Sequence, residues 1–136
     1  MQIFELHHRL AADCFEVADL TLSKLLMMND SRYPWFILVP RRNDIREIYQ
    51  LAAADRRQLL DESCLLAEAL QHSYNPDKLN IAAIGNLVPQ LHLHHVVRYQ
   101  SDATWPAPVW GKLPALTYAV EQAQIELERI RKQLQL

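Results

Sequence analysis

The stretch QLHLHHVVR, residues 90–98, places polar side chains at alternate positions of an otherwise largely apolar run. In an extended strand successive side chains point to opposite faces, so Gln90, His92, His94 and Arg98 share one face. Neighbours along that face stand about 6.5–7 Å apart. The other face is mainly apolar and is expected to pack against the core. The pattern therefore predicts a strand that carries a polar row of one amide, two imidazoles and one guanidinium.

Three interpretations fit this row. Two imidazoles at this spacing can ligate one zinc ion, but a zinc site needs three or four ligands and the arginine would repel the cation. An imidazole can also attack a phosphorus atom when a neighbouring group orients it and positive charge stabilises the oxygens. The third interpretation is a pair of ordinary hydrogen-bonded histidines. The spacing alone leaves the choice open, and zinc fits the row least well.

The rest of the chain predicts an α+β fold with an antiparallel sheet. WFILVP, residues 35–40, is a short apolar strand closed by proline, and NDSRYP before it is typical of a turn. With a strand inside residues 17–28 it predicts a hairpin. The other expected elements are a helix over 4–16, a helix that begins near Asp55 with a capping box to Gln58, strands over 79–85 and 90–99, and a final helix with Pro114 in its first turn.

Length and composition narrow the possibilities. The chain has 136 residues, and we expect a single domain over residues 1–136. A net charge of −2 argues against a broad basic surface for nucleic acid. No stretch approaches the roughly 18 uninterrupted apolar residues of a membrane span, and the first residues do not read as a signal peptide. Cys14 and Cys64 belong to no metal-binding or disulfide motif, so we expect two free thiols and a cytoplasmic protein.

The polar row resembles the signature of the histidine triad (HIT) family, which is His-φ-His-φ-His-φ-φ with φ apolar. Gln90 falls at the first histidine, His92 at the second and His94 at the third. The preceding GNLVP, residues 85–89, is similar to the family's Gly-Gln-Ser/Thr-Val run, with Asn86 in place of glutamine. The first hairpin and the order of helices and strands are similar to the family as well.

The resemblance covers about residues 15–100, and a loop rich in Trp and Pro and a helix follow over residues 101–136. It implies a HIT-like fold in which flanking helices cover an antiparallel sheet of about five strands. Family members are commonly homodimers, so it also implies a homodimer. Trp105 and Trp110 flank two prolines in the loop, and they form either a flap over the pocket or ordinary packing on the core.

The resemblance implies a function in nucleotide chemistry. HIT proteins hydrolyse or transfer nucleotidyl groups, and diadenosine polyphosphates and nucleoside phosphoramidates are typical substrates. By this resemblance His92 attacks the α-phosphorus and forms a nucleotidyl-histidine intermediate, which water then resolves. His94 and Gln90 complete the catalytic group, and Asn86 donates a hydrogen bond to the phosphate. No metal or other cofactor is implied, and the expected partner is a purine nucleotide or dinucleotide.

The resemblance also suggests further substrate-binding residues. Asp30, or Asn29 beside it, would meet the ribose hydroxyls. Arg98 falls where a basic residue follows the motif in some branches of the family, and we expect it to bind substrate. Apolar residues near Leu26 and Ile37 would flank the base.

Two of the departures from the family pattern bear on catalysis. Gln90 makes hydrogen bonds but cannot carry the charge of an imidazole. Leu87 removes a hydroxyl that would help the leaving group. A non-catalytic nucleotide-binding or interaction module with a degenerate triad is therefore the alternative to an enzyme. If the altered triad limits the rate, the substitution Gln90→His should raise the activity.

Overall fold

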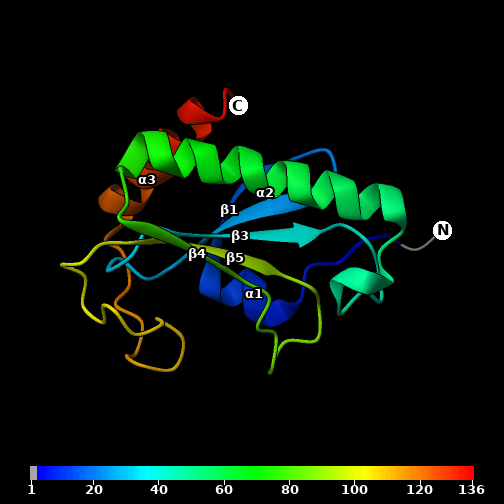
Figure 1. Ribbon diagram of the computed structural model, residues 1–136, viewed down its shortest axis with the longest axis horizontal. Helices are drawn as coiled ribbons and strands as arrows, with labels where there is room; N and C mark the ends of the chain where they lie inside the picture. The colour runs from blue at the N-terminus through cyan, green and yellow to red at the C-terminus, as the bar shows by residue number, and fades with distance from the viewer. Residues whose placement is uncertain (1–2) are drawn as a thin grey trace.

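The computed structural model describes residues 3–136, which form one five-stranded antiparallel sheet flanked by helices (Figure 1). The strands lie in the order β1-β2-β3-β5-β4, which confirms the predicted α+β class. The strands are β1 (Cys14–Asp19), β2 (Ser23–Met28), β3 (Trp35–Pro40), β4 (Lys78–Ala82) and β5 (Leu93–Arg98). The helices are α1 (His8–Asp13), the short 3-10 helix η1 (Ile48–Gln50), α2 (Ala53–Tyr74) and α3 (Val120–Gln133).

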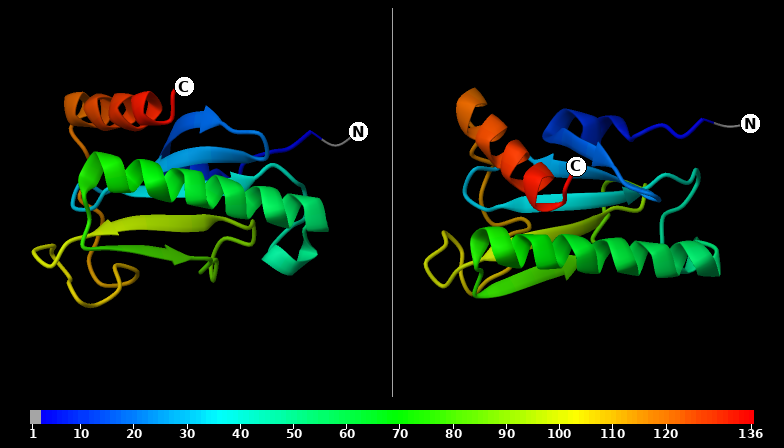
Figure 2. Two further views of the ribbon diagram at one scale, coloured as in Figure 1. Left: turned by 45° about the horizontal axis from the view of Figure 1, so that its top comes forward. Right: turned by 90° about the horizontal axis from the view of Figure 1, so that it is seen from above.

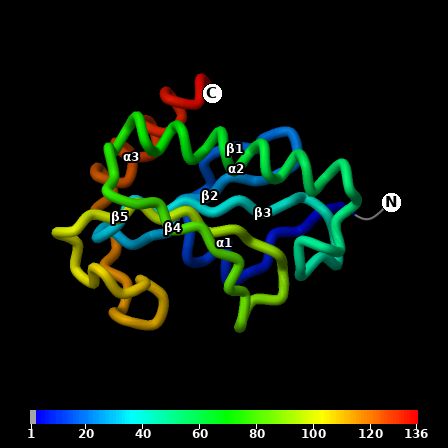
Figure 3. Tube along the Cα trace, viewed as in Figure 1, coloured from blue at the N-terminus to red at the C-terminus, as the bar shows by residue number. Residues whose placement is uncertain are grey.

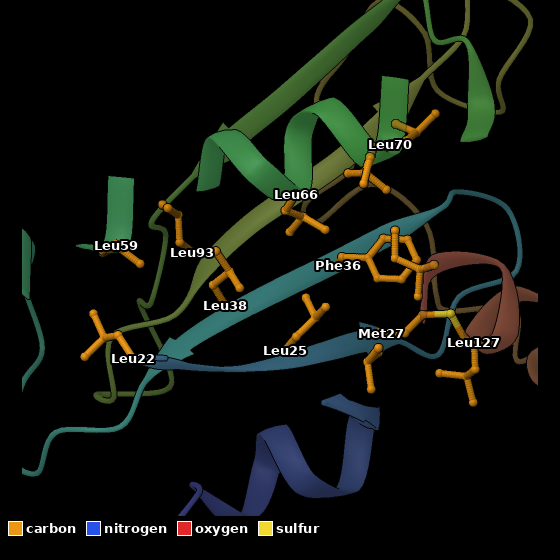
Figure 4. Close-up of a cluster of buried hydrophobic side chains, with 14 of the residues drawn as sticks. Leu22, Leu25, Met27, Phe36, Leu38, Leu59, Leu66, Leu70, Leu93 and Leu127 are labelled. Carbon is orange, nitrogen blue, oxygen red and sulfur yellow. The ribbon is translucent and has the colours of Figure 1, made fainter. Parts of the chain in front are cut away.

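Helices cover both faces of the sheet. The long helix α2 runs beside α3 over one face, and α1 lies against the opposite face (Figures 1 and 2). The main hydrophobic core fills the space between the sheet and the two longer helices, where Leu25, Phe36, Leu66, Leu70 and Leu127 meet (Figure 4). Because these side chains are almost fully removed from water, they supply most of the driving force for folding.

A second hydrophobic cluster lies on the other face of the sheet. It takes the side chains of β2 and β3 that alternate with those of the main core, such as Leu26 and Ile37. Leu10 of α1 and Val109 of the segment after β5 complete it. The sheet is therefore apolar on both faces, and the second face is covered partly by irregular chain.

The strand predictions are confirmed for the central strands and incomplete at the edge. β3 occupies residues 35–40 as predicted, and it pairs with β2 as the predicted hairpin. β5 begins at Leu93, three residues later than the predicted strand. The edge strand β1 was not predicted, because the expected helix over residues 4–16 ran into it. In the structure that helix is α1 and ends at Asp13.

The N-terminus of α2 differs from the prediction. The helix begins at Ala53 after an N-cap alanine that makes no side-chain capping bond. Asp55 forms an ion pair with Arg42 instead, with 2.8 Å between Oδ2 and Nε. The predicted capping box between Asp55 and Gln58 is therefore wrong. The C-terminus follows the sequence signal, since Asn75 adopts the left-handed conformation with φ 46° and a proline comes next.

The last helix also begins later than predicted, at Val120 rather than near Pro114. The residues between them form no regular element and bind the β2–β3 turn. The backbone N–H of Ser31 donates to the carbonyl oxygen of Leu116 over 2.7 Å.

Two long irregular segments follow β4 and β5, and both leave the sheet on the side away from α2 (Figure 3). They carry most of the walls of the site described below. Within residues 3–136, no helix has the length and apolar character needed to cross a membrane.

Candidate functional site

The alternation predicted for the histidine strand is present from Leu93 onward. His94 and Arg98 point to the face that carries α1, where Val96 belongs to the second hydrophobic cluster. His95 points to the opposite face and approaches α2, with 2.7 Å between its Nε2 and the Oγ of Ser63. His95 is therefore a core histidine, separate from the site.

His92 lies just before the strand, and its ring orientation is set by its own chain. Its Nδ1 is 2.7 Å from the carbonyl oxygen of Gln90. A carbonyl oxygen can only accept a hydrogen bond, so Nδ1 carries the proton in the neutral ring. Nε2 then holds the lone pair. This is the tautomer that an attacking imidazole needs, because the lone pair is the nucleophile.

His94 is held in the opposite tautomer. The indole Nε1 of Trp35 donates to its Nδ1 over 3.0 Å, so the ring proton lies on Nε2. Burial lowers the pKa of His94 to about 3, and the charges of His92 and His95 act in the same direction. His94 is therefore neutral at ordinary pH and offers one N–H. The rings of His92 and His94 meet edge to face with centroids 4.9 Å apart.

Two adjoining cavities share His92 as a wall. One, which we call the Arg46 cavity, has a volume of about 450 Å³ and is bounded by η1, the residues just before it and Gln90. The other, the Trp110 cavity, has a volume of about 470 Å³ and is lined by His94, Leu87 and Trp110. The walls that the two cavities share are Ile84, Gly85, Asn86, Val88 and His92.

The turn at Gly85 brings the chain against the histidine. Gly85 has φ +57°, a conformation that favours glycine. A Cβ built at this position would lie 3.7 Å from Cε1 of His92. Asn86 follows with an exposed side chain in the wall of both cavities, where its amide can donate to a bound phosphate. Sequence and structure thus agree in bringing Asn86 to His92.

Gln90 has a different role from the one its place in the signature suggested. Its Oε1 accepts the backbone N–H of His7 over 2.8 Å, and its Nε2 donates to the carbonyl of Glu5 over 3.0 Å. The carboxamide therefore fastens the segment before α1. The main-chain carbonyl of the same residue binds His92.

Arg98, expected to bind substrate, lies away from both cavities. Its side chain is 1% exposed and forms an ion pair with Asp102, with 2.8 Å between Nε and Oδ2. Its other donors bind Asn80 and the carbonyl of Ala107, and its guanidinium lies 5.5 Å from the ring centroid of Trp105. The guanidinium organises the loop after β5 and is already fully engaged there.

Asn29 and Asp30 are also outside the two cavities. The Oδ1 of Asn29 accepts the backbone N–H of Tyr118 over 2.9 Å. The carboxylate of Asp30 is buried and accepts hydrogen bonds from the backbone and the guanidinium of Arg32. Both side chains stabilise the β2–β3 turn and the segment that leads to α3. The structure does not bring them to His92.

Two tryptophans contribute to the site, and only one was singled out in the sequence. The Trp110 ring lies 5.4 Å from His94 and 6.0 Å from Trp35, centroid to centroid. Leu26 and Ile37, expected to flank the base, are fully buried in the cluster that Trp110 packs against. The loop tryptophan therefore both packs on the core and lines a cavity. Trp35 was missed as a partner of His94, although it opens the predicted strand.

The zinc interpretation of the histidine row needs three or four ligands around one ion. Nowhere in residues 3–136 do three or more His, Cys, Asp or Glu side chains form a group that could hold a metal ion. In the histidine pair, hydrogen bonds hold Nδ1 of His92 and Nδ1 of His94.

The family model for the HIT domain matches residues 9–101, which is more than half of the chain. The chain belongs to the histidine triad family. HIT proteins are generally nucleotide-binding hydrolases or transferases, and the fold described above is that of a HIT protein.

Solved structures of bacterial HIT proteins are closely similar. A histidine triad protein from Marinobacter aquaeolei is 48% identical, with a TM-score of 0.96 and 98% of each chain covered. One from Bradyrhizobium japonicum is 43% identical, with a TM-score of 0.95, 98% of this chain covered and 99% of the other. One from Sinorhizobium meliloti is 39% identical, with a TM-score of 0.94 and 96% of each chain covered. A search of curated proteins found no match.

Proposed function

We propose that this HIT protein is a nucleotide hydrolase or nucleotidyl transferase that acts through a nucleotidyl-histidine on His92. The proposed substrate is a diadenosine polyphosphate or a nucleoside phosphoramidate. The observation that carries the proposal is the hydrogen bond from Nδ1 of His92 to the carbonyl of Gln90, which leaves the Nε2 lone pair available in a wall of two cavities.

In the first step the Nε2 lone pair attacks the α-phosphorus. A P–N bond forms, the bond from phosphorus to the leaving group breaks, and its electron pair departs with the leaving group. The ring becomes a cationic imidazolium, and its Nδ1–H bond to the Gln90 carbonyl strengthens because a charged donor makes the stronger bond. Water then attacks phosphorus, the P–N bond breaks, and Nε2 recovers its lone pair.

Two groups would stabilise the oxygens during this displacement, and a third would orient the nucleophile. His94 offers its Nε2–H from the Trp110 cavity, and Asn86 offers its amide from the shared wall. Both donors are neutral, so neither repels a ring that becomes cationic. Fixed donors aimed at developing charge contribute strongly to catalysis because they need no reorganisation during the reaction. Gln90 acts on the nucleophile through its carbonyl.

Mass spectrometry of the intact protein tests the proposal. Wild-type protein mixed with adenosine 5′-phosphoramidate should show a covalent adenylyl adduct after acid-free quenching, and peptide mapping should place the adduct on His92. His92→Ala should show neither adduct nor AMP release. His72→Ala, at an exposed position on α2, is the matched control and should behave as wild type. Turnover retained in His92→Ala would contradict the proposed mechanism.

The second candidate is a nucleotide-binding module without turnover. It is favoured by Leu87, which is 82% exposed and brings no hydroxyl to the leaving group. It is also favoured by Gln90, whose side chain is engaged with residues 5–7. A thermal shift with AMP together with the absence of any adduct or AMP release would identify a binder.

We also propose that the protein is a homodimer in the cytoplasm. β4 is an edge strand, and its outer side is adjacent to exposed apolar residues, among them Leu60 and Ile81, around a groove between α2 and β4. A second copy would cover this surface. Light scattering coupled to size exclusion should give twice the chain mass, and Ile81→Lys should shift it to the monomer. The free thiols Cys14 and Cys64 suit a reducing compartment.

A further inference from the structure

The Arg46 cavity is lined by an arginine whose guanidinium has no partner among the described residues. No hydrogen bond or ion pair of the Arg46 guanidinium is present among residues 3–136, whereas the guanidinium groups of Arg41, Arg42 and Arg98 all bind acceptors. An exposed arginine commonly lacks partners, but this one lines a cavity that also contains His92. A substrate bound at His92 can therefore place an anionic group beside the Arg46 guanidinium.

The backbone that carries Arg46 is fixed. The side-chain Oε1 of Gln50 accepts the backbone N–H of Arg46 over 2.8 Å and that of Glu47 over 3.0 Å. The carboxylate of Glu47, the acidic group of the cavity wall, is turned to the backbone N–H of Gln50 in a capping box. Arg46 therefore brings a cationic side chain to the cavity wall, where it can meet an anionic ligand.

The two cavities differ in character. The Trp110 cavity is walled by an indole and aliphatic side chains and offers surfaces to a nucleoside. The Arg46 cavity is bounded by polar and charged side chains, and Tyr49 stands at its edge with a 73% exposed ring. Because the cavities adjoin at His92 and Asn86, a phosphoryl group at the histidine can extend one substituent into each.

We infer that the Arg46 cavity is the subsite for the departing part of the substrate and that it selects anionic leaving groups, with Arg46 binding their phosphates. The inference rests on the proposed function, and it assigns the leaving group to the Arg46 cavity. When Nε2 of His92 bonds to the α-phosphorus, the P–O bond to the bridging oxygen breaks and its electron pair remains on the departing phosphate. The guanidinium offsets that added negative charge. Tyr49 offers a ring on which the base of a departing nucleoside phosphate stacks.

The test compares two substrates that transfer the same adenylyl group. Diadenosine triphosphate releases the anion ADP, whereas adenosine 5′-phosphoramidate releases neutral ammonia, because its nitrogen takes a proton from solvent as the P–N bond breaks. Arg46→Glu should lower kcat/KM for diadenosine triphosphate by about 10- to 100-fold, the loss expected when one charge-assisted hydrogen bond is removed. The same variant should change kcat/KM for the phosphoramidate by less than about twofold. Arg46→Lys should retain part of the selectivity because it keeps the charge and loses the planar fork.

Arg57→Glu is the matched control, since it makes the same charge change at an exposed position of α2 that lines neither cavity. It should leave the ratio of the two kcat/KM values unchanged. Equal losses for both substrates in Arg46→Glu, or a ratio that matches Arg57→Glu, would overturn the inference.

Binding of ADP by calorimetry makes the inference independent of turnover. Arg46→Glu should weaken ADP binding by about 10-fold relative to Arg57→Glu and leave adenosine binding equal in the two variants. If this difference appears while no substrate turns over, the subsite stands and the proposed catalysis fails. If ADP binds both variants equally, the subsite fails whatever the activity.

Discussion

The indole Nε1 of Trp35 donates to Nδ1 of His94 across the β3–β5 pair, at 3.0 Å. One hydrogen bond thus decides which nitrogen of a buried ring carries its proton. The sequence predicts β3 from its apolar character alone. Its first residue, Trp35, nevertheless sets the tautomer of His94 on β5, the strand beside it in the sheet.

In Trp35→Phe the ring proton of His94 should no longer be fixed on Nε2. The buried Nδ1 loses its donor, which we expect to destabilise the protein by about 1–3 kcal/mol. Loss of the fixed Nε2–H should lower kcat by about tenfold, less than the roughly 100-fold or greater loss when a transition-state donor is removed outright. Nitrogen-15 NMR of the His94 ring should show a mixture of tautomers in Trp35→Phe.

Trp110→Phe is the comparison for that measurement. The Nε1 of Trp110 is buried without a hydrogen-bond partner among the described residues, so its removal breaks no bond. The His94 tautomer should be unchanged in Trp110→Phe. An unchanged tautomer in Trp35→Phe would mean that another group fixes the ring.

Two buried histidines should make stability depend on pH. Burial lowers the pKa of His94 to about 3 and that of His95 to about 4, although hydrogen bonds to the backbone act in the opposite direction on His95. The unfolded chain takes up protons near pH 6.5 and the folded chain does not. The free energy of unfolding should therefore fall as pH drops from 6.5 toward 4, by about 1.4 kcal/mol per pH unit for each histidine.

Urea unfolding at pH 7, 6 and 5 measures this slope. In His95→Gln the slope should be about half that of the wild type because one of the two groups is removed. His72→Gln, at the exposed end of α2, should keep the wild-type slope. A flat stability profile for wild type between pH 7 and 5 would show that the two rings take up protons in the folded state.

The side-chain hydrogen bonds of Gln90 reverse the expectation that Gln90→His raises the activity. Gln90→His should lower kcat, because a neutral imidazole replaces the carboxamide that binds both Glu5 and His7. We expect losses of about 10- to 100-fold in Gln90→Ala, since small displacements of a nucleophile reduce rates strongly. Removal of residues 1–7 should produce a similar loss.

A double-variant cycle separates this coupling from general damage. The loss from Gln90→Ala should be much smaller in the protein that lacks residues 1–7, because the partners are already absent. Additive losses would show that the carboxamide and the segment act on the site independently. A rate increase in Gln90→His would restore the interpretation based on the family signature.

We expect Arg98 to stabilise the fold and not to bind substrate. Arg98→Ala leaves the Asp102 carboxylate, which is 4% exposed, buried without its cation and bound only by backbone N–H groups, and we expect a loss of about 3–5 kcal/mol in the free energy of unfolding. Arg57→Ala, an exposed position, should change it by less than about 0.5 kcal/mol. At a temperature where Arg98→Ala remains folded, its KM should match that of wild type, and a selective rise in KM would show that Arg98 meets substrate.

The strands that could be read from the sequence are those with an uninterrupted pattern. WFILVP lies at the sheet centre and is apolar at every position, so it was located to the residue. β1 was missed because the helix expected over residues 4–16 overlaps its start, and because its pairing with β2 shifts between Glu16 and Ala18. A bulge adds a residue and breaks the alternation on which such predictions rest.

The site was predictable where it depends on local chain and not where it depends on pairing between distant segments. His92, His94 and Asn86 lie in one short run and were brought together as expected. Arg98 lies on the same face of the strand as His94, but the loop after β5 folds back and encloses its side chain. The spacing of residues along the strand cannot predict this fold of the loop. Arg46 lines the same cavity as His92 because the chain after β3 lies against the segment after β4, where the backbone N–H of Leu91 donates to the carbonyl of Ile45 over 2.9 Å.

Gln90 joins two tasks in one residue, since its side chain binds residues 5–7 and its carbonyl orients the reacting imidazole. A molecule that displaces residues 5–7 from the outside would loosen the nucleophile while both cavities stay empty. Such an inhibitor needs neither a phosphate nor a purine, and it would be distinguished from a substrate mimic by its failure to compete with nucleotide.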